Sequence, residues 1–135
     1  MVEVPEEFVQ SVNKPGRIGV LATADAQGRP NAAYFGSPRF EEDGGFGMAL
    51  ADNRTLKNLE QNPYAVFLCL EDSPVSFKTK GCRLYLKVRE IQKEGPLLDR
   101  RKEAITRAAG PEAAKLVQAA VVFDVAEVRA LVAMP

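Results

Sequence analysis

Two cations at the start of a short predicted helix are the residues of this chain most suited to chemistry. The segment 52–63, DNRTLKNLEQNP, has capping residues at its start and a proline at its end, which predicts a helix. Arg54 and Lys57 fall in its first turn, where the helix dipole is positive and backbone N–H groups are free. Cations there destabilise the helix unless an anion is bound, and the Thr55 hydroxyl adds a donor. The pattern therefore points to a site for phosphate or another anion.

The same turn also has a purely structural explanation. Asp52 and Glu60 can balance the two cations, and solvated basic turns are common in short helices. Composition alone favours this explanation, so the turn by itself leaves the anion site open.

The segment 31–37, NAAYFGS, alternates small and aromatic residues around Gly36. A glycine lets a planar ligand approach the backbone closely, and small side chains leave room for a ring. Close packing in a small barrel explains the same pattern, so the segment alone does not distinguish a ligand site from a core strand.

Composition removes several classes of chemistry. The chain of 135 residues contains no histidine, so the commonest general base, metal ligand and haem ligand are absent. Cys69 and Cys82 have no CxxC or Cys/His partner, which excludes a zinc or iron–sulfur ligand set, and both are expected to be buried free thiols. The length and the 46% hydrophobic content predict one domain over residues 1–135.

Charge and hydropathy limit the partners and the location. The N-terminal sequence MVEVPEE is acidic where a secretory signal is basic, and no apolar run is long enough to span a membrane. The chain is therefore expected to be cytoplasmic, with no membrane partner. Arg83, Tyr85, Lys87 and Arg89 share one strand face and could serve a single-stranded nucleic acid. Because 18 basic residues balance 18 acidic ones, a solvated outer face is favoured and no nucleic acid is expected.

Runs of β-branched and apolar residues between turn residues predict a mainly β protein. The predicted strands are residues 17–24, 30–37, 46–51, 64–70, 75–88 and 119–132. The predicted helices are residues 5–13, 52–63, 95–109 and 112–118. Asp43 and Gly44 form a hairpin signal, so Phe40 should pair with the third of these strands.

Two of the predicted strands have unusual apolar patterns. Residues 64–70, YAVFLCL, are apolar on both faces, which places this strand at the centre of a sheet. In residues 75–88 the apolar phase changes at Gly81, which predicts a β-bulge there. Many antiparallel strands with few helices fit a closed or split barrel better than an open sheet, because closure removes exposed edges.

The order of these elements resembles that of the pyridoxamine 5′-phosphate oxidase-like, FMN-binding split-barrel family. Four segments carry the likeness: GVLATADAQGRPNAAYFGSP, FGMAL, DNRTLKNLEQNPYAVFLCL and FKTKGCRLYLKVREI. The most specific stretch is Arg54-Thr55 followed by LEQNP and an apolar strand, and the glycine in KTKGCRLYL is a second marker. The likeness covers about residues 8–132.

The resemblance implies a six-stranded antiparallel split β-barrel with a few short helices. It also implies a homodimer with two FMN molecules in clefts between the subunits. The residues that it assigns to FMN are Tyr34, Phe35, Gly36 and Ser37 at the isoalloxazine ring, Met48, Ala49 and Leu50 at the ribityl chain, and Arg54, Thr55 and Lys57 at the phosphate. Lys78 or Lys80 could approach the cofactor from the second subunit.

The chain is shorter than the true pyridoxamine oxidases and lacks the C-terminal Arg and His that act on the pyridoxal substrate. That vitamin chemistry is therefore not expected, and neither is histidine-ligated haem. The resemblance implies an FMN-dependent oxidoreductase with a small molecule or a redox protein as electron donor or acceptor. A non-catalytic flavin-binding or electron-transfer protein, a deazaflavin-binding relative and a cofactor-free barrel are the alternatives. Neither the substrate nor the donor can be read from the sequence.

The residues give a separate reason to expect a homodimer. Segments 64–70 and 119–123 carry apolar side chains on both faces, more than one small barrel interior can hide. A second subunit would cover the excess.

Overall fold

The computed structural model describes residues 2–72 and 74–133, so residues 1, 73, 134 and 135 of the predicted domain lie outside the described part. Within it, all strands join one antiparallel sheet of seven in the order β2-β1-β5-β6-β7-β4-β3. The strands are β1 (Ile18–Ala24), β2 (Pro30–Tyr34), β3 (Arg39–Phe40), β4 (Phe46–Ala51), β5 (Tyr64–Leu70), β6 (Gly81–Gln92) and β7 (Val117–Ala130). The helices are α1 (Glu6–Asn13), α2 (Arg54–Gln61), α3 (Pro96–Ala109) and α4 (Pro111–Lys115).

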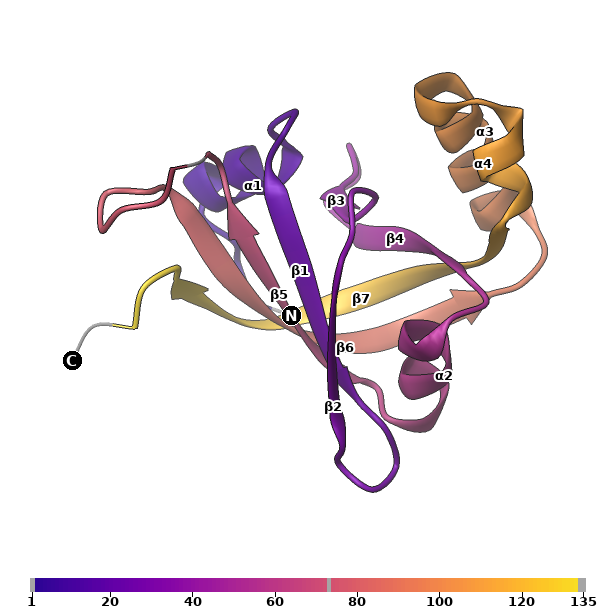
Figure 1. Cartoon of the computed structure of the whole chain (residues 1–135), viewed down its shortest axis with the longest axis horizontal. Helices are drawn as coiled ribbons and strands as arrows, with labels where there is room; N and C mark the ends of the chain where they lie inside the picture. Colours follow the sequence, from indigo (N-terminus) through magenta and orange to yellow (C-terminus); the bar gives the residue numbers. More distant parts are fainter. Residues whose placement is uncertain (1, 73, 134–135) are drawn as a thin grey trace.

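The sheet curls strongly, so that β1 and β2 cross the direction of β6 and β7 (Figure 1). This is the predicted mainly β split barrel. It has seven strands rather than six because the two-residue β3 adds a pair to β4, with Phe40 opposite Phe46. That pair is the hairpin predicted from Asp43 and Gly44.

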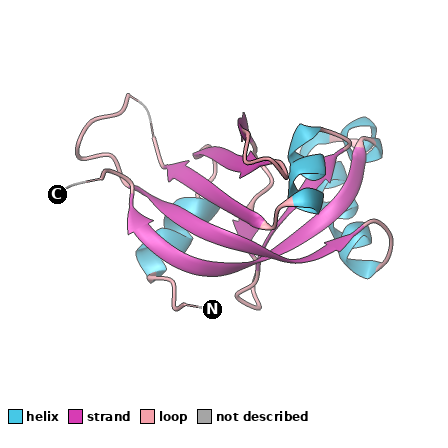
Figure 2. Ribbon diagram, turned by 90° about the horizontal axis from the view of Figure 1, so that it is seen from below, coloured by secondary structure: helices cyan, strands magenta, loops and turns pink. Residues whose placement is uncertain are grey.

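Helices lie at both ends of the long twisted strands (Figure 2). At one end α1 packs Val12 into the main core, and at the other α2 contributes Leu56 and Leu59. The core itself is built around Phe46, whose ring centroid lies 5.6 Å from that of Phe67 and 6.0 Å from that of Phe123. No helix in the part of the chain that the structure describes is long and apolar enough to cross a membrane.

The β-bulge predicted at Gly81 is wrong. β6 begins at this residue, and the register shifts of β6 lie further along, at Tyr85/Leu86 and Val88/Glu90. Gly81 is instead required by a close approach, because an added Cβ would lie 2.0 Å from the carbonyl oxygen of Cys69. The change of apolar phase therefore marks the start of β6 at Gly81, six residues after the start that the sequence predicts.

The apolar strand near the C-terminus is β7, which begins at Val117 rather than at the predicted residue 119. Its residues 119–123 do have two apolar faces, but both are covered within the chain. One face lines the main core, and Ala120 on the other packs with Ala49 of β4 and Leu98 of α3. This segment therefore does not need a second subunit, unlike β5, whose outer side chains remain half-buried.

Candidate functional site

The first turn of α2 places two cations beside a cavity. Asn53 caps the helix, since its Oδ1 accepts a hydrogen bond of 3.0 Å from the Leu56 backbone N–H. Leu56 and Asn58 turn inward, and the Asn58 amide donates to Thr23 Oγ1 at 3.0 Å. Anchored in this way, the helix directs Arg54 and Lys57 to the exposed side.

The cavity beside α2 has a volume of about 550 Å³. Its lining combines α2 with the β1–β2 turn: Asp25, Gln27, Arg29, Pro30, Asn31, Arg54, Lys57, Asn58 and Gln61. The turn is docked on the helix by a hydrogen bond of 3.0 Å from the Ala26 N–H to Gln61 Oε1. Arg54 and Lys57 thus share one concave surface, as the sequence predicted for an anion site.

Arg29 is a third cation of this cavity, which the sequence analysis missed. Its Nε lies 2.7 Å from Asp25 Oδ2, so its charge is already paired. The backbone N–H of Arg29 also donates to Asp25, and these contacts lower the pKa of the Asp25 carboxyl. The signal was available in the turn residues 25–28, which bring residue 29 back towards residue 25.

Glu60 does not balance the charges of Arg54 and Lys57 in the structure. Glu60, which could have balanced the cations, pairs with Lys93 instead at 3.0 Å. Across residues 2–72 and 74–133, neither Arg54 nor Lys57 forms a hydrogen bond or ion pair through its side chain. Two unpaired cations beside the positive end of a helix make this cavity a candidate anion site.

Thr55 does not join these cations at the surface. Its side chain is 1% exposed and does not line the cavity, because it lies on the inward side of the first turn. Its predicted contact with a phosphate stays a prediction, and Arg54 and Lys57 are the better placed of the three residues.

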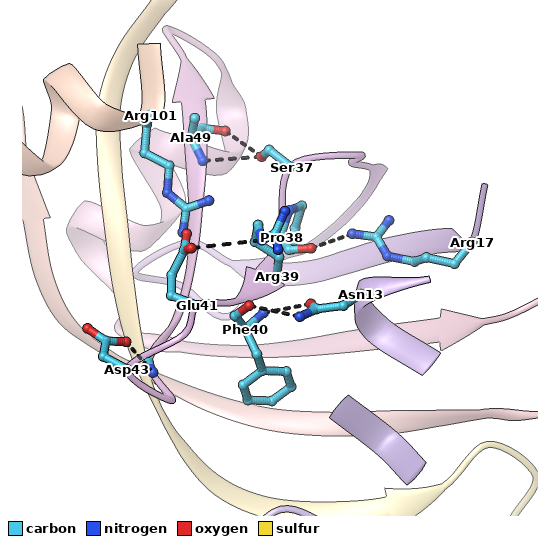
Figure 3. A network of polar contacts seen from close by, with 11 residues as sticks. Asn13, Arg17, Ser37, Pro38, Arg39, Phe40, Glu41, Asp43, Ala49 and Arg101 are labelled. Atoms are coloured by element: carbon cyan, nitrogen blue, oxygen red, sulfur yellow. Dashed lines mark hydrogen bonds and ion pairs between the residues drawn. The ribbon is translucent and has the colours of Figure 1, made fainter. Parts of the chain in front are cut away.

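The residues predicted to face a planar ring lie at the end of β2 and just beyond it. Tyr34 is 64% exposed, Gly36 is exposed, and Phe35 packs against the main core. The Ser37 hydroxyl donates to the Ala49 carbonyl oxygen and accepts from the Ala49 N–H, both at 3.1 Å (Figure 3). The segment 34–37 is therefore hydrogen-bonded to β4, the strand that contains the residues predicted to flank the ribityl chain.

Within β4, the side chains of Met48 and Leu50 cannot reach a surface ligand. They are 0% and 1% exposed and point into the core, and Ala49 packs under α3. A ligand could meet only the backbone of this strand. The signal was present in FGMALA, which alternates large and small residues: the large Phe46, Met48 and Leu50 occupy the inward positions.

β4 connects the two groups of predicted residues. Ser37 is fastened at Ala49, and the strand ends at Ala51, three residues before Arg54. Tyr34 and Gly36 line a separate cavity of about 300 Å³ with residues of the α1–β1 turn. The two predicted groups therefore line separate cavities, and β4 joins them along the chain.

Lys78 and Lys80 are exposed in the loop between β5 and β6. In Figure 1 this loop lies at the opposite end of the molecule from α2. Contact between either lysine and the α2 cavity would therefore require a second subunit, as the resemblance implied.

The two cysteines and the basic residues of β6 form contacts within the fold. Cys69 and Cys82 are buried free thiols at paired positions of β5 and β6, and the described residues contain no cluster of three metal-binding side chains. On the outer face of β6, the Arg83 Nε donates to the Ala130 carbonyl oxygen, and Arg89 pairs with Asp124. Of the four residues predicted on this face, Lys87 and Arg89 are exposed and Arg83 and Tyr85 are half-buried.

Over residues 4–131 the sequence matches the family model described as pyridoxamine 5′-phosphate oxidase. No curated protein sequence matches the chain. Several solved structures match it closely in fold. One is an FMN-binding protein from Syntrophomonas wolfei subsp. wolfei, which is 20% identical with a TM-score of 0.82 and a match that covers 96% of this chain and 87% of that one.

Two other solved structures of this fold are named for haem and for F420. HutZ, the haem storage protein from Vibrio cholerae, is 21% identical with a TM-score of 0.67, over 93% of this chain and 90% of that one. An F420 reductase is 18% identical with a TM-score of 0.71, over 93% of this chain and 98% of that one. At these identities the likeness shows the fold alone.

Proposed function

The chain belongs to the pyridoxamine 5′-phosphate oxidase family, and from that premise we propose that it is a flavoprotein that binds FMN. The observation that carries the proposal is the pair of unpaired cations, Arg54 and Lys57, beside a cavity at the N-terminus of α2. An FMN phosphate would supply the missing counter-charge, with the guanidinium offering two parallel N–H donors. The Syntrophomonas wolfei protein of the same fold, which binds FMN, supports this choice.

The rest of FMN would follow the edge of β4 towards Gly36. The backbone of β4 would line the ribityl chain, because the side chains of Met48 and Leu50 are buried in the core. The exposed Gly36 would leave the ring free to approach the backbone. When bound, the flavin supplies one- and two-electron transfer, and the protein supplies binding and electrostatics.

A deazaflavin is the second candidate, since an F420 reductase has the same fold and F420 is a deazaflavin. Haem, named for HutZ, is disfavoured because the chain has no histidine to serve as an axial ligand. We therefore propose an oxidoreductase or electron carrier whose partner is a small molecule or a redox protein.

The absorption spectrum of the freshly purified protein tests the cofactor. We expect the two visible bands of an oxidised flavin, or stoichiometric binding when FMN is added to colourless protein. Riboflavin, which lacks the phosphate, should bind at least about tenfold more weakly, because each lost charge-assisted hydrogen bond removes about 1.5–3 kcal/mol. A colourless protein that binds neither compound would refute the proposal, and equal affinity for both would refute the phosphate site.

Proton transfer by a side chain should be dispensable in this site. Tyr34 and Ser37 are the protic side chains of the predicted ring-facing segment, and the Ser37 hydroxyl is already engaged with the Ala49 backbone. Neither side chain type is a base near neutral pH. We expect Tyr34→Phe and Ser37→Ala to keep the rate of flavin reduction within about tenfold of the parent, measured by stopped-flow absorbance on FMN-loaded protein. A drop of about a thousandfold with flavin still bound would reveal an acid or base at one of them.

We further propose that the active form is a homodimer built on the outer face of β1, β2 and β5. The strand register aligns two uncharged rows across these strands: Tyr34, Val20 and Leu68 in one, and Ala32, Ala22 and Val66 in the next. Tyr34 is 64% exposed and Tyr64, at the start of β5, is 61% exposed. A sheet face open to water normally carries polar residues. An uncharged face that spans three strands therefore favours a second copy of the chain as its cover.

A further inference from the structure

Arg17, between α1 and β1, is buried with only 6% of its surface exposed, and it holds the backbone of another segment. Its Nη1 donates to the Phe35 carbonyl oxygen at 2.9 Å, and its Nη2 donates to those of Gly36 and Pro38. Its Nε donates to the Val12 carbonyl oxygen at 2.9 Å, at the end of α1. One guanidinium therefore joins α1 to three carbonyl groups of residues 35–38, and Figure 3 shows its contact with Pro38.

No carboxylate forms an ion pair with this guanidinium in residues 2–72 and 74–133. Its charge is balanced by the carbonyl dipoles and by the Phe67 ring, whose centroid lies 5.1 Å from the Arg17 Cζ. The Arg17 side chain can lie over the Phe67 ring only because residue 19 is a glycine. A Cβ added at Gly19 would lie 2.7 Å from Arg17 Nη1. A buried charge is costly unless its donors are satisfied, and here the satisfied partners are backbone atoms of one short segment.

The residues that follow β2 have little regular pairing of their own. The Phe35 N–H donates to the Gly19 carbonyl oxygen at 2.9 Å, and residues 36–38 belong to no strand. Beyond them, the Asn13 side-chain amide exchanges two hydrogen bonds with the backbone of Phe40, at 2.8 and 2.9 Å. Side chains from the α1–β1 corner thus fix the path of the chain between β2 and β4.

We propose that Arg17 is a positioning residue of the ligand site, because it fixes the backbone of residues 35–38. The inference rests on the proposed flavin site, in which the backbone of residues 35–37 forms the end that receives the ring. Arginine suits the task because its planar fork reaches several carbonyl groups at fixed angles, whereas the lysine ammonium is a single point. Arg17 also lines the cavity that contains Tyr34 and Gly36, and amide exchange without cofactor separates its hold on the backbone from any contact with the ligand.

Amide hydrogen exchange of the cofactor-free protein tests whether Arg17 holds the segment. In Arg17→Met we expect exchange at the Phe35 amide to rise by about tenfold or more, with the Phe40 amide unchanged. Asn13→Ala is the matched control, and it should produce the reverse pattern. If Arg17→Met does not fold, Arg17→Lys keeps the charge without the fork and should raise exchange at Phe35 by a smaller factor.

Flavin affinity tests whether the held segment is part of the ligand site. Arg17→Met should weaken FMN and riboflavin by the same factor, about tenfold, because it acts on the ring end and leaves the phosphate end intact. Asn13 lines the cavity of Tyr34 and Gly36, so the affinity control is Arg107→Glu on α3, outside this cavity and the α2 cavity, which should leave both affinities unchanged. Weaker binding of FMN alone, or unchanged binding of both in a folded variant, would overturn the proposal.

The two proposals fail in different ways. A parent protein that binds no flavin refutes the proposed function, whatever the Arg17 variants do. A Phe35 amide whose exchange is the same in parent, Arg17→Met and Arg17→Lys refutes the role of Arg17, even if the parent binds FMN tightly.

Discussion

Arg54→Glu is expected to weaken FMN binding by about 30- to 1000-fold and to abolish the preference for FMN over riboflavin. The substitution removes a bidentate, charge-assisted contact and sets a carboxylate against the phosphate, a loss of about 2 to 4 kcal/mol. Lys57 and the helix N-terminus remain, so weak binding should persist. Riboflavin affinity should hardly change, because that ligand has no phosphate to repel.

Flavin fluorescence titration of both ligands measures this effect. Arg107→Glu is a suitable control, since it makes the same change of net charge on α3, where Arg107 is exposed and pairs with Glu103. Its FMN affinity should equal that of the parent. If Arg54→Glu binds FMN as tightly as the parent does, the phosphate does not lie at α2.

Local sequence signals were sufficient for much of the fold. The β3–β4 hairpin followed from Asp43 and Gly44, because few residues adopt the backbone of such a turn, and Gly44 has a φ of 86°. α2 followed from a cap at one end and Pro63 at the other. The cation pair of the candidate site could be located for the same reason, because both residues belong to one helical turn.

Features that depend on distant parts of the chain could not be predicted in this way. Gly81 marks a close approach to the carbonyl group of Cys69 on the neighbouring strand, and a one-strand pattern cannot distinguish this from a bulge. The second face of β4 is covered by distant segments, since Ala49 packs with Ala120 of β7 and Leu98 of α3. The contacts of Arg17 with residues 35–38 join positions about twenty residues apart. A pattern of neighbouring residues therefore cannot predict them.

Val20→Asp is expected to dissociate the proposed dimer and, with it, to remove bound FMN. Val20 lies on β1 between Tyr34 and Leu68, in the middle of the uncharged outer face and with no cation directly opposite. In a two-fold symmetric dimer the carboxylate would be buried twice and without a partner. A buried, unpaired charge costs about 3 to 5 kcal/mol, so the dissociation constant of the dimer should rise by at least about a hundredfold.

Sedimentation velocity at micromolar concentration, read at both the protein and the flavin wavelengths, measures assembly and cofactor together. Val20→Thr keeps the shape of the side chain without a charge and should remain a flavin-containing dimer. Gln118→Asp places the same carboxylate on an exposed position of β7 and should also behave as the parent. A parent that sediments as a monomer with FMN bound would refute a site between subunits. A Val20→Asp variant that stays dimeric would place the interface on another face of the sheet.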